Sequence, residues 1–160
     1  MMDLRHSKDN VSFRCWYNMI NRPYQNVEVC ESWKIYENFA PWFYENFVDG
    51  FDLDKDLKVP GSKVYSPDTC MFIPSTLNRK LVSIWRTKGI TWHERSQKYR
   101  VQVFDVKRHK RHRVFSSTNI DACHAVYLEY KCQYFDYLAK QYLEYSKYIL
   151  NLKEYWRLTW

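Results

Sequence analysis

The chain has 160 residues, of which 46% are hydrophobic and 27% charged, and it contains only 3 glycines and 5 prolines. This composition supports a folded core and excludes collagen-like, linker-like and disordered chains. Aromatic residues reach 19%, so their rings either build the core or lie exposed where they can stack on something flat.

Basic residues outnumber acidic ones by 25 to 18, and the excess is concentrated in the second half of the chain. Residues 1–80 hold 10 basic and 11 acidic residues, whereas residues 81–160 hold 15 and 7. Within that half, residues 86–113 hold 10 basic and 2 acidic residues, a formal charge of +8. Such a patch favours a polyanion or an anionic membrane surface as partner.

The sequence contains no apolar run long enough to span a bilayer, and residues 1–10 are polar, so we expect no membrane association and no signal peptide. The five cysteines form no C-x-x-C pair, which makes a four-cysteine zinc site an unfavourable interpretation. Their odd number favours free, buried thiols in a reducing compartment. The expected location is the cytoplasm.

Two helices are predicted first. Residues 12–22 place Phe13, Trp16 and Ile20 at helical spacing, and Pro23 ends that helix. A second helix is predicted over residues 32–47, with a break near residue 40 because Pro41 opens a new turn. The aromatic residues of both helices are expected to pack in the core.

The pattern of apolar and charged residues changes after residue 49. Residues 51–56 alternate apolar and charged side chains, as a half-buried strand does. Pro60-Gly61 indicates a turn, residues 63–65 can return as a second short strand, and a helix is predicted to begin at Pro74.

A different pattern follows in residues 89–150. Three short strands are predicted over residues 90–93, 99–105 and 111–116, with Val101 and Val103 on the opposite face to Arg100 and Gln102. Thr118-x-x-Asp121 resembles a capping box that opens a long helix, whose apolar stripe reaches residue 149. Residues 151–160 either extend that helix or dock separately.

The long helix also carries a second, tyrosine-rich face. Three interpretations of this face remain open: packing against the first half of the chain, a homodimer interface, or stacking on nucleic-acid bases. Its members are Tyr127, Tyr130, Tyr134, Tyr137 and Tyr148.

Three ordered stretches resemble small phage proteins of the HNH homing-endonuclease type. They are Trp16-Tyr17-Asn18-Met19-Ile20 with Val29-Cys30-Glu31-Ser32-Trp33 and Phe39; Leu53-Asp54-Lys55-Asp56 with Tyr65-Ser66-Pro67-Asp68-Thr69-Cys70; and Gly89-Ile90-Thr91-Trp92-His93 with Lys98-Tyr99-Arg100-Val101-Gln102 and Ala125-x-x-Leu128-Glu129-Tyr130-Lys131. The resemblance implies an α+β chain. Residues 11–85 would form an HNH-like ββα-metal unit with extra N-terminal helices, residues 86–150 a three-stranded antiparallel sheet packed on one long helix, and residues 151–160 an extension.

The nuclease resemblance implies a set of catalytic residues and a divalent metal, Mg²⁺ or Mn²⁺. Lys55 lies near the usual histidine position, Thr69 replaces the loop asparagine, and Asp56 completes the catalytic group. The implied metal ligands are Asp54, Asp56 and Asn78.

This motif departs from the family pattern, because the sequence has no histidine between Arg22 and Thr91. A protonated lysine accepts no proton unless its pKa is strongly lowered. A slow nuclease, an inactive scaffold and a merely solvated acidic strand therefore remain open alternatives.

The third stretch resembles the DNA-binding domain of ethylene-response factors, in which a three-stranded sheet enters the major groove. This resemblance implies double-stranded DNA as the partner, with Arg and Gln side chains reading bases and the basic turn gripping phosphates. The candidate DNA-binding residues are Thr91, His93, Arg95, Lys98, Arg100, Gln102, Lys107, Arg108, Lys110, Arg111 and Arg113.

Three functions follow as hypotheses. The first is a phage-type DNA-binding endonuclease or its degenerate descendant. The second is a protein that only binds, for example a DNA-binding regulator or an inhibitor of a host nucleic-acid enzyme. The third is a protein-interaction module whose aromatic surface binds another protein.

Overall fold

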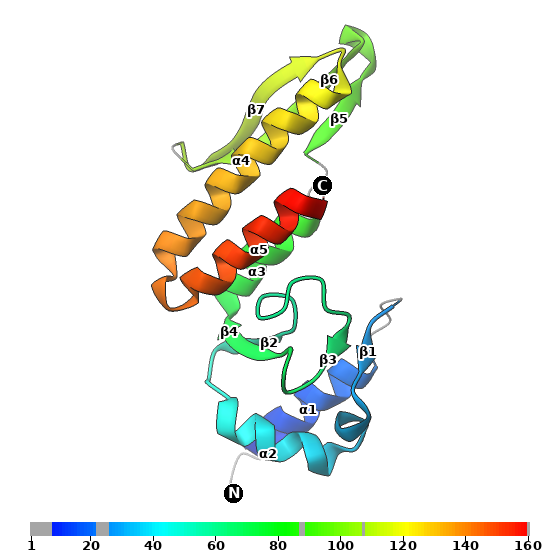
Figure 1. Cartoon of the computed structure of the whole chain (residues 1–160), viewed down its shortest axis with the longest axis vertical. Coiled ribbons are helices and arrows are strands. Elements are labelled where there is room, and N and C mark those ends of the chain that lie inside the picture. Colours follow the sequence, from blue (N-terminus) through cyan, green and yellow to red (C-terminus); the bar gives the residue numbers. More distant parts are fainter. Residues whose placement is uncertain (1–7, 22–25, 87–88, 107, 160) are drawn as a thin grey trace, which may run out of the picture. The chain divides into compact units, whose positions relative to one another are not determined.

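The computed structural model describes residues 8–21, 26–86, 89–106 and 108–159. The chain is α+β and contains the predicted three-stranded antiparallel sheet and a long helix (Figure 1). It divides into two compact units, Met1–Asn78 and Arg79–Trp160. The division falls inside helix α3 (Ser75–Arg86), seven residues before the boundary expected from the sequence.

The helices of the first unit are α1 (Lys8–Ile20), the 3₁₀ turn η2 (Glu31–Lys34) and α2 (Tyr36–Asn46). The break predicted in the second helix is wrong, because α2 continues through Pro41. Proline removes its own N–H from the helix and crowds the carbonyl of the residue four positions earlier. The fully buried Phe39 and Phe43 hold the turns on either side of it in place. The 3₁₀ turn η2 occupies the first residues of the predicted helix.

Four short strands complete this unit. β1 (Glu28–Val29) pairs in parallel with β3 (Val64–Tyr65), and β2 (Phe51–Asp54) pairs antiparallel with β4 (Met71–Pro74), which leads directly into α3. Neither β1 nor β4 was predicted from the sequence.

The predicted strand over residues 51–56 ends early. The Asp54 carboxylate accepts the backbone N–H groups of Asp56 and Leu57 at 3.0 and 2.7 Å, which turns the chain after Asp54. Both backbone N–H groups therefore bond to the Asp54 side chain and are not available to a neighbouring strand, so β2 ends at Asp54.

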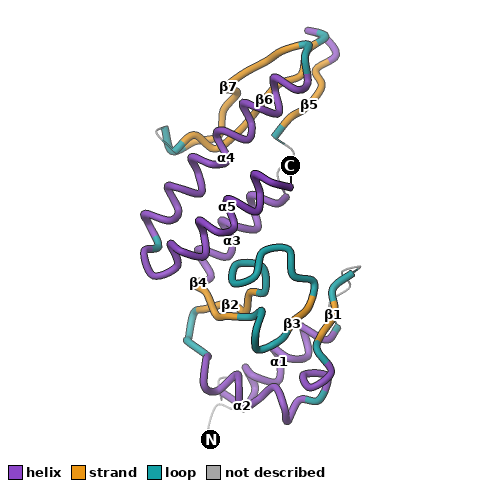
Figure 2. The backbone as a smooth tube through the Cα atoms, in the orientation of Figure 1, coloured by secondary structure: helices purple, strands orange, loops and turns teal. Residues whose placement is uncertain are grey.

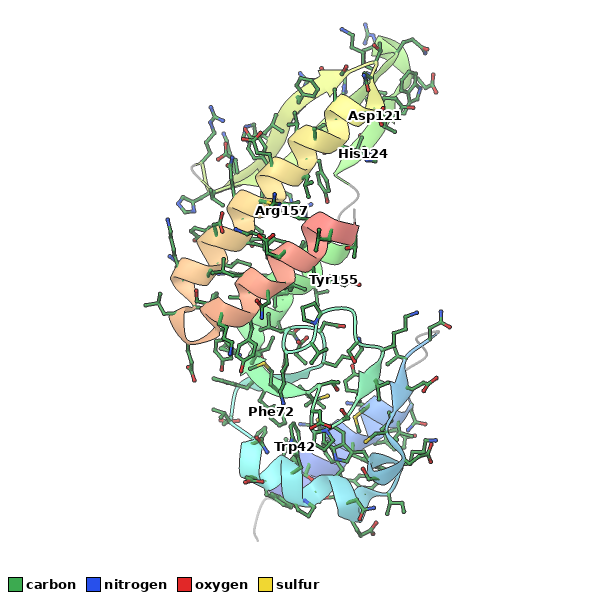
Figure 3. All side chains as sticks on the ribbon, viewed as in Figure 1. Trp42, Phe72, Asp121, His124, Tyr155 and Arg157 are labelled. Atoms are coloured by element: carbon green, nitrogen blue, oxygen red, sulfur yellow. The ribbon has the colours of Figure 1, made fainter. Side chains whose placement is uncertain are left out.

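The core of the first unit is built from rings, as the aromatic content suggests. Trp33, Phe39 and Phe43 are fully buried, and Trp42 stacks on Phe72 with ring centroids 5.7 Å apart (Figure 3). These contacts join α2 to the β2–β4 pair, so the aromatic ladder serves packing.

The second unit contains the sheet β5 (Ile90–His93), β6 (Lys98–Asp105) and β7 (Lys110–Ser117), in the order β5-β6-β7 (Figure 2). These bounds agree with the predicted strands to within one residue. The buried Val101 and Val103 pack with Cys123 and Tyr127 of helix α4 (Ile120–Gln141). Asn119 caps α4 by accepting the N–H groups of residues 121 and 122, in place of the predicted Thr118 capping box.

The single long helix predicted up to residue 149 is wrong. α4 ends at Gln141, the chain turns at η4 (Leu143–Tyr145), and α5 (Ser146–Thr159) runs back beside α4 (Figure 1). Lys153 pairs with Asp136 at 2.7 Å, and Trp156 packs near Phe135. The apolar stripe therefore folds back on itself, which buries both halves within one unit. None of the helices within the described ranges is long and apolar enough to cross a membrane.

Part of the tyrosine face belongs to the core of the second unit. Tyr127 is buried, and a Cβ atom at Gly89 would lie 1.9 Å from its ring, so only glycine fits there. Tyr134 packs on Phe104 with centroids 5.3 Å apart. The homodimer and base-stacking interpretations of the remaining tyrosines stay predictions.

Candidate nucleic-acid interface and acidic cluster

The pleat of the three-stranded sheet separates an apolar face from a polar one. Cross-strand register places Thr91 opposite Arg100, Arg100 opposite Ser116, and His93 opposite Lys98. Val101, Tyr99 and Ile90 alternate with these residues and pack toward α4. The polar face therefore presents Thr91, His93, Lys98, Arg100 and Ser116, which we call the polar sheet face.

The cations of this face are not engaged within the chain. Lys98 of this face is exposed and Arg100 is half-buried, and Arg113 is exposed on β7 beyond the bulge described below. In the part of the chain that the structure describes, none of these three side chains forms a hydrogen bond or an ion pair. Unpaired cations on a sheet face are available to an external anion.

The turn between β5 and β6 is ordered by its own side chains. His93 Nδ1 accepts the backbone N–H of Ser96 at 3.3 Å, and Trp92 Nε1 donates to Glu94 at 2.9 Å. Gln97 takes a positive φ of 48° at the end of the turn. Arg95 lies exposed in this turn, at the edge of the polar sheet face.

The basic turn between β6 and β7 contains an internal ion pair that was not predicted. Arg108 donates to the carboxylate of Asp105 at 2.9 Å, and His112 Nε2 lies 3.7 Å from the same carboxylate. Asp105 is only 4% exposed, so the Arg108 guanidinium is engaged by a buried carboxylate of its own chain. Lys110 is exposed, whereas the predicted phosphate contact Lys107 lies outside the described residues.

A β-bulge between residues 101 and 102 divides the predicted DNA-binding set. Beyond it, Gln102 pairs with Arg113, and both are exposed. Gln102 and Arg111 also line a small cavity with residues of α4. A bulge changes the direction of the side chains that follow it, and beyond this one Arg111 lies beside residues of α4. Arg111 is therefore not part of the polar sheet face.

In the first unit, an acidic cluster lies at the start of α3. Asp52 accepts a hydrogen bond from Ser75 Oγ at 2.7 Å and another from Asn78 Nδ2 at 2.9 Å. The β2–β4 register explains this meeting, because Asp52 lies opposite Ile73, two residues before α3 begins.

The residues predicted to be catalytic stabilise a turn. Lys55 is 8% exposed and donates to Asp56 and, at 2.9 Å, to the carbonyl of Ser62. Burial raises the pKa of the neighbouring Asp54 to about 6, although its two backbone hydrogen bonds act in the opposite direction. Lys55 is thus a hydrogen-bond donor here, the opposite of a general base.

Thr69 closes the loop that leads into β4. Its hydroxyl donates to the carbonyl of Val64 at 2.6 Å, and it accepts the backbone N–H of Ser66. The adjacent Cys70 is buried, and burial raises the pKa of its thiol to about 12, so it is an inert thiol. Both residues hold the loop in place.

The predicted metal ligands fit a cation poorly as a set. One oxygen of Asp54 accepts two backbone N–H groups, Asp56 is paired with Lys55, and Asn78 bonds to Asp52. Within the described residues, no group of three or more His, Cys, Asp and Glu side chains could hold a metal ion. The carboxamide oxygen of Asn78 has no hydrogen bond within the described ranges, so Asp52 and Asn78 form the better pair of oxygen ligands. Asp52 is not among the ligands that the resemblance implies.

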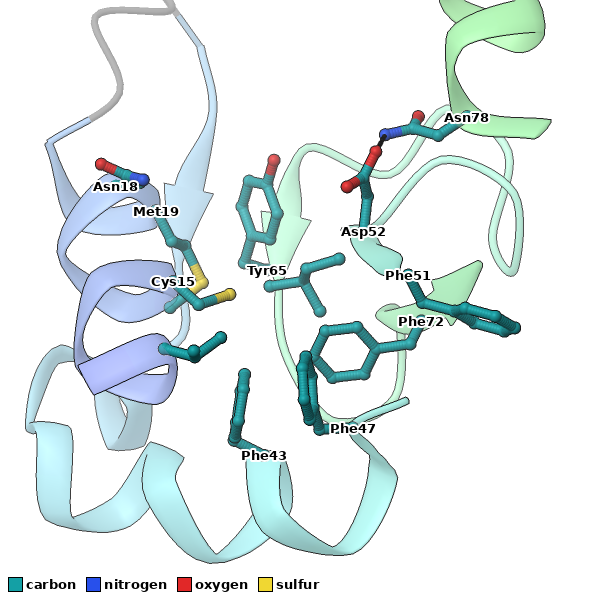
Figure 4. A pocket seen from close by; sticks show the side chains of 12 residues that line it. Cys15, Asn18, Met19, Phe43, Phe47, Phe51, Asp52, Tyr65, Phe72 and Asn78 are labelled. Carbon is teal, nitrogen blue, oxygen red and sulfur yellow. Dashed lines mark hydrogen bonds between the residues drawn. The ribbon is translucent and has the colours of Figure 1, made fainter. Parts of the chain in front are cut away.

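Asp52 and Asn78 lie at the border of a cavity of about 330 Å³ in the first unit (Figure 4). Its walls are mainly apolar and aromatic, with Phe43, Phe47 and Phe72 among them, and Asn18 adds a further amide. Asn18 lies on α1, across the cavity from Asp52 and Asn78 (Figure 4). A cavity that combines apolar side chains with a few polar groups is typical of a ligand pocket.

Comparison of the chain with protein-family models, with curated proteins and with solved structures gives no match.

Proposed function

We propose that residues 79–160 bind double-stranded DNA through the polar sheet face. The observation that carries this proposal is the set of Lys98, Arg100 and Arg113, three cations of the sheet that have no intramolecular partner among the described residues. Lys98 and Arg100 lie on the face opposite the one that packs against α4. The charge of +8 over residues 86–113 supports it, because phosphate neutralisation dominates affinity for nucleic acid.

The chemistry of this face fits base reading as well as phosphate binding. An arginine can donate two hydrogen bonds to guanine and a glutamine can pair with adenine, while lysine and threonine contact the backbone. Arg100 occupies the middle strand, flanked by Thr91 and Ser116, so small neighbours leave its guanidinium room to reach a base. Lys98 and Lys110 are the expected phosphate contacts.

A mobility-shift titration with a duplex tests this proposal. The double variant Arg100→Gln/Arg113→Gln should bind at least several-fold more weakly than the wild type. The control Lys140→Gln/Lys147→Gln removes the same charge from exposed positions on α4 and α5 and should bind about as well as the wild type. Equal losses in both variants would mean that net charge alone holds the DNA, and the proposal would fail.

A second candidate function is hydrolysis of a DNA phosphodiester in the first unit. The Asp52–Asn78 pair favours it, because β4 pairs with β2 and leads directly into α3, which brings a carboxylate and a carboxamide to one cavity edge. A bound Mg²⁺ or Mn²⁺ would act there as a Lewis acid on the phosphoryl oxygens. Asp52 would hold the ion, and Asn78 would orient Asp52.

Nicking of supercoiled DNA with Mg²⁺ or Mn²⁺ tests the second candidate. Asp52→Asn should abolish nicking, whereas Asp56→Asn should retain it, since Asp56 is engaged by Lys55. If no metal supports nicking while DNA binding persists, the chain acts by binding alone, as a DNA-binding regulator or an inhibitor of a host nucleic-acid enzyme would.

A further inference from the structure

A small cavity lies in the second unit, between the β6–β7 ribbon and α4. Residues Gln102 and Arg111 line it from the β6–β7 ribbon, and Tyr130, Lys131 and Tyr134 line it from α4. Its volume is about 20 Å³, enough for one water-sized group.

Lys131 is the unusual member of this lining. It is only 8% exposed, and its Nζ donates to the carbonyl of Ile84 at 3.3 Å and lies 5.1 Å from the centre of the Tyr127 ring. An ammonium group has three donors, so this one carbonyl leaves two of them without an acceptor in the described part of the chain. Buried lysines without an anionic partner are rare, because desolvation of the charge is costly.

The surroundings of Lys131 add positive charge and supply no negative charge. Burial first, and then the charge of Arg111, lower the pKa of Lys131 to about 8. No carboxylate lines the cavity. The hydroxyl of Ser83, which also lines it, donates to the carbonyl of Lys80 at 2.7 Å. The tyrosine hydroxyls of residues 130 and 134 are further potential donors.

We propose that this cavity binds a phosphate group. One phosphate oxygen has the size of the cavity and would accept from Lys131, while the other oxygens would lie at the mouth beside the exposed guanidinium of Arg111. Charge-assisted hydrogen bonds from two cations are the usual means of holding a phosphate. The phosphate comes either from free anions or from a DNA backbone, and the site does not depend on the proposed polar sheet face.

Titration with sodium phosphate, against sodium chloride at equal ionic strength, tests the site on the full chain without DNA. Amide resonances around Lys131 and Arg111 should shift with phosphate only. Lys131→Met keeps the length of the apolar stem and should weaken phosphate binding about tenfold or more, as expected for loss of a charged hydrogen bond. Arg111→Gln, at an exposed position, should also weaken it, whereas Lys140→Gln should not.

A DNA titration of the same variants distinguishes the two sources of phosphate. If the site takes a DNA phosphate, Lys131→Met should weaken duplex binding and reduce the salt slope by about one. If it takes a free anion, duplex affinity should stay unchanged while the phosphate-specific shifts disappear. The proposal would be overturned if phosphate caused no specific shift and Lys131→Met left duplex affinity unchanged. This outcome does not depend on whether the polar sheet face binds DNA.

Discussion

Asn78 donates a hydrogen bond from Nδ2 to the carboxylate of Asp52 at 2.9 Å, joining the first turns of α3 to strand β2. The carboxylate also accepts from Ser75, so two side chains of α3 converge on one acid. This contact positions a carboxylate and a carboxamide side by side at the border of the 330 Å³ cavity.

Replacing Asn78 by aspartate should destabilise the first unit. The substitution places a second carboxylate beside Asp52, so repulsion replaces a hydrogen bond. The free energy of unfolding should fall by about 1 to 3 kcal/mol at pH 7. The loss should shrink in acid, where the carboxyls are protonated. Asn18→Asp, which places the same charge at an exposed position elsewhere around the cavity, is the control. Chemical denaturation of both variants at two pH values measures the difference, and equal costs would contradict this account of the contact.

The buried Asp54 should make stability depend on pH. Burial raises its folded pKa from 3.8 to about 6, so ionisation disfavours the folded state. Its contribution to stability is greatest below pH 4 and is lost as the pH rises through about 6, a change of roughly 2 to 3 kcal/mol. Asp54→Asn keeps an oxygen for the N–H groups of Asp56 and Leu57 and should remove this part of the pH profile.

Unfolding free energies of the wild type and of Asp54→Asn between pH 4 and pH 7 check this expectation. The variant should be the more stable protein at pH 7 and close to the wild type at pH 4. Parallel profiles would show that Asp54 titrates normally in the folded protein.

Gly89 should tolerate no side chain. A Cβ atom there would lie 1.9 Å from the Tyr127 ring, and the carbonyl of Gly89 accepts the backbone N–H of Gln102 at 2.7 Å. Moving the ring would disturb the packing of α4 on the sheet, so Gly89→Ala should cost about 1 to 3 kcal/mol.

A double-mutant cycle identifies this steric cause. Gly89→Ala should cost clearly less in a Tyr127→Leu background, where the ring is absent. Additive effects would place the strain elsewhere.

The sequence predicted the sheet well because period-two alternation in residues 99–105 is a local signal that the packing on α4 reinforces. It failed where a tertiary contact decides the outcome. The long stripe up to Ile149 satisfies helical spacing whether the helix is straight or folded back, and only the burial of Trp156 and its neighbours against α4 distinguishes the two.

The candidate sites show the same division. Arg100 was predicted from strand alternation, because the face on which it lies depends only on the pleat. The direction of the Arg111 side chain depends on a bulge. The hydrogen bond between Asn78 and Asp52 depends on the β2–β4 register, and no pattern in the sequence indicated β4. The pairing of Arg108 with the buried Asp105 was detectable in principle, since a lone acid beside a basic run attracts a partner.

The most direct test of the proposed DNA-binding function is chemical-shift mapping of the full chain with a short duplex at low salt. We expect the amides of Thr91, Lys98 and Arg100 to shift, and the shifts to fade as salt is raised because counterion release weakens phosphate contacts. Shifts confined to residues 8–78, or no shifts at all, would contradict DNA binding through the sheet β5-β6-β7.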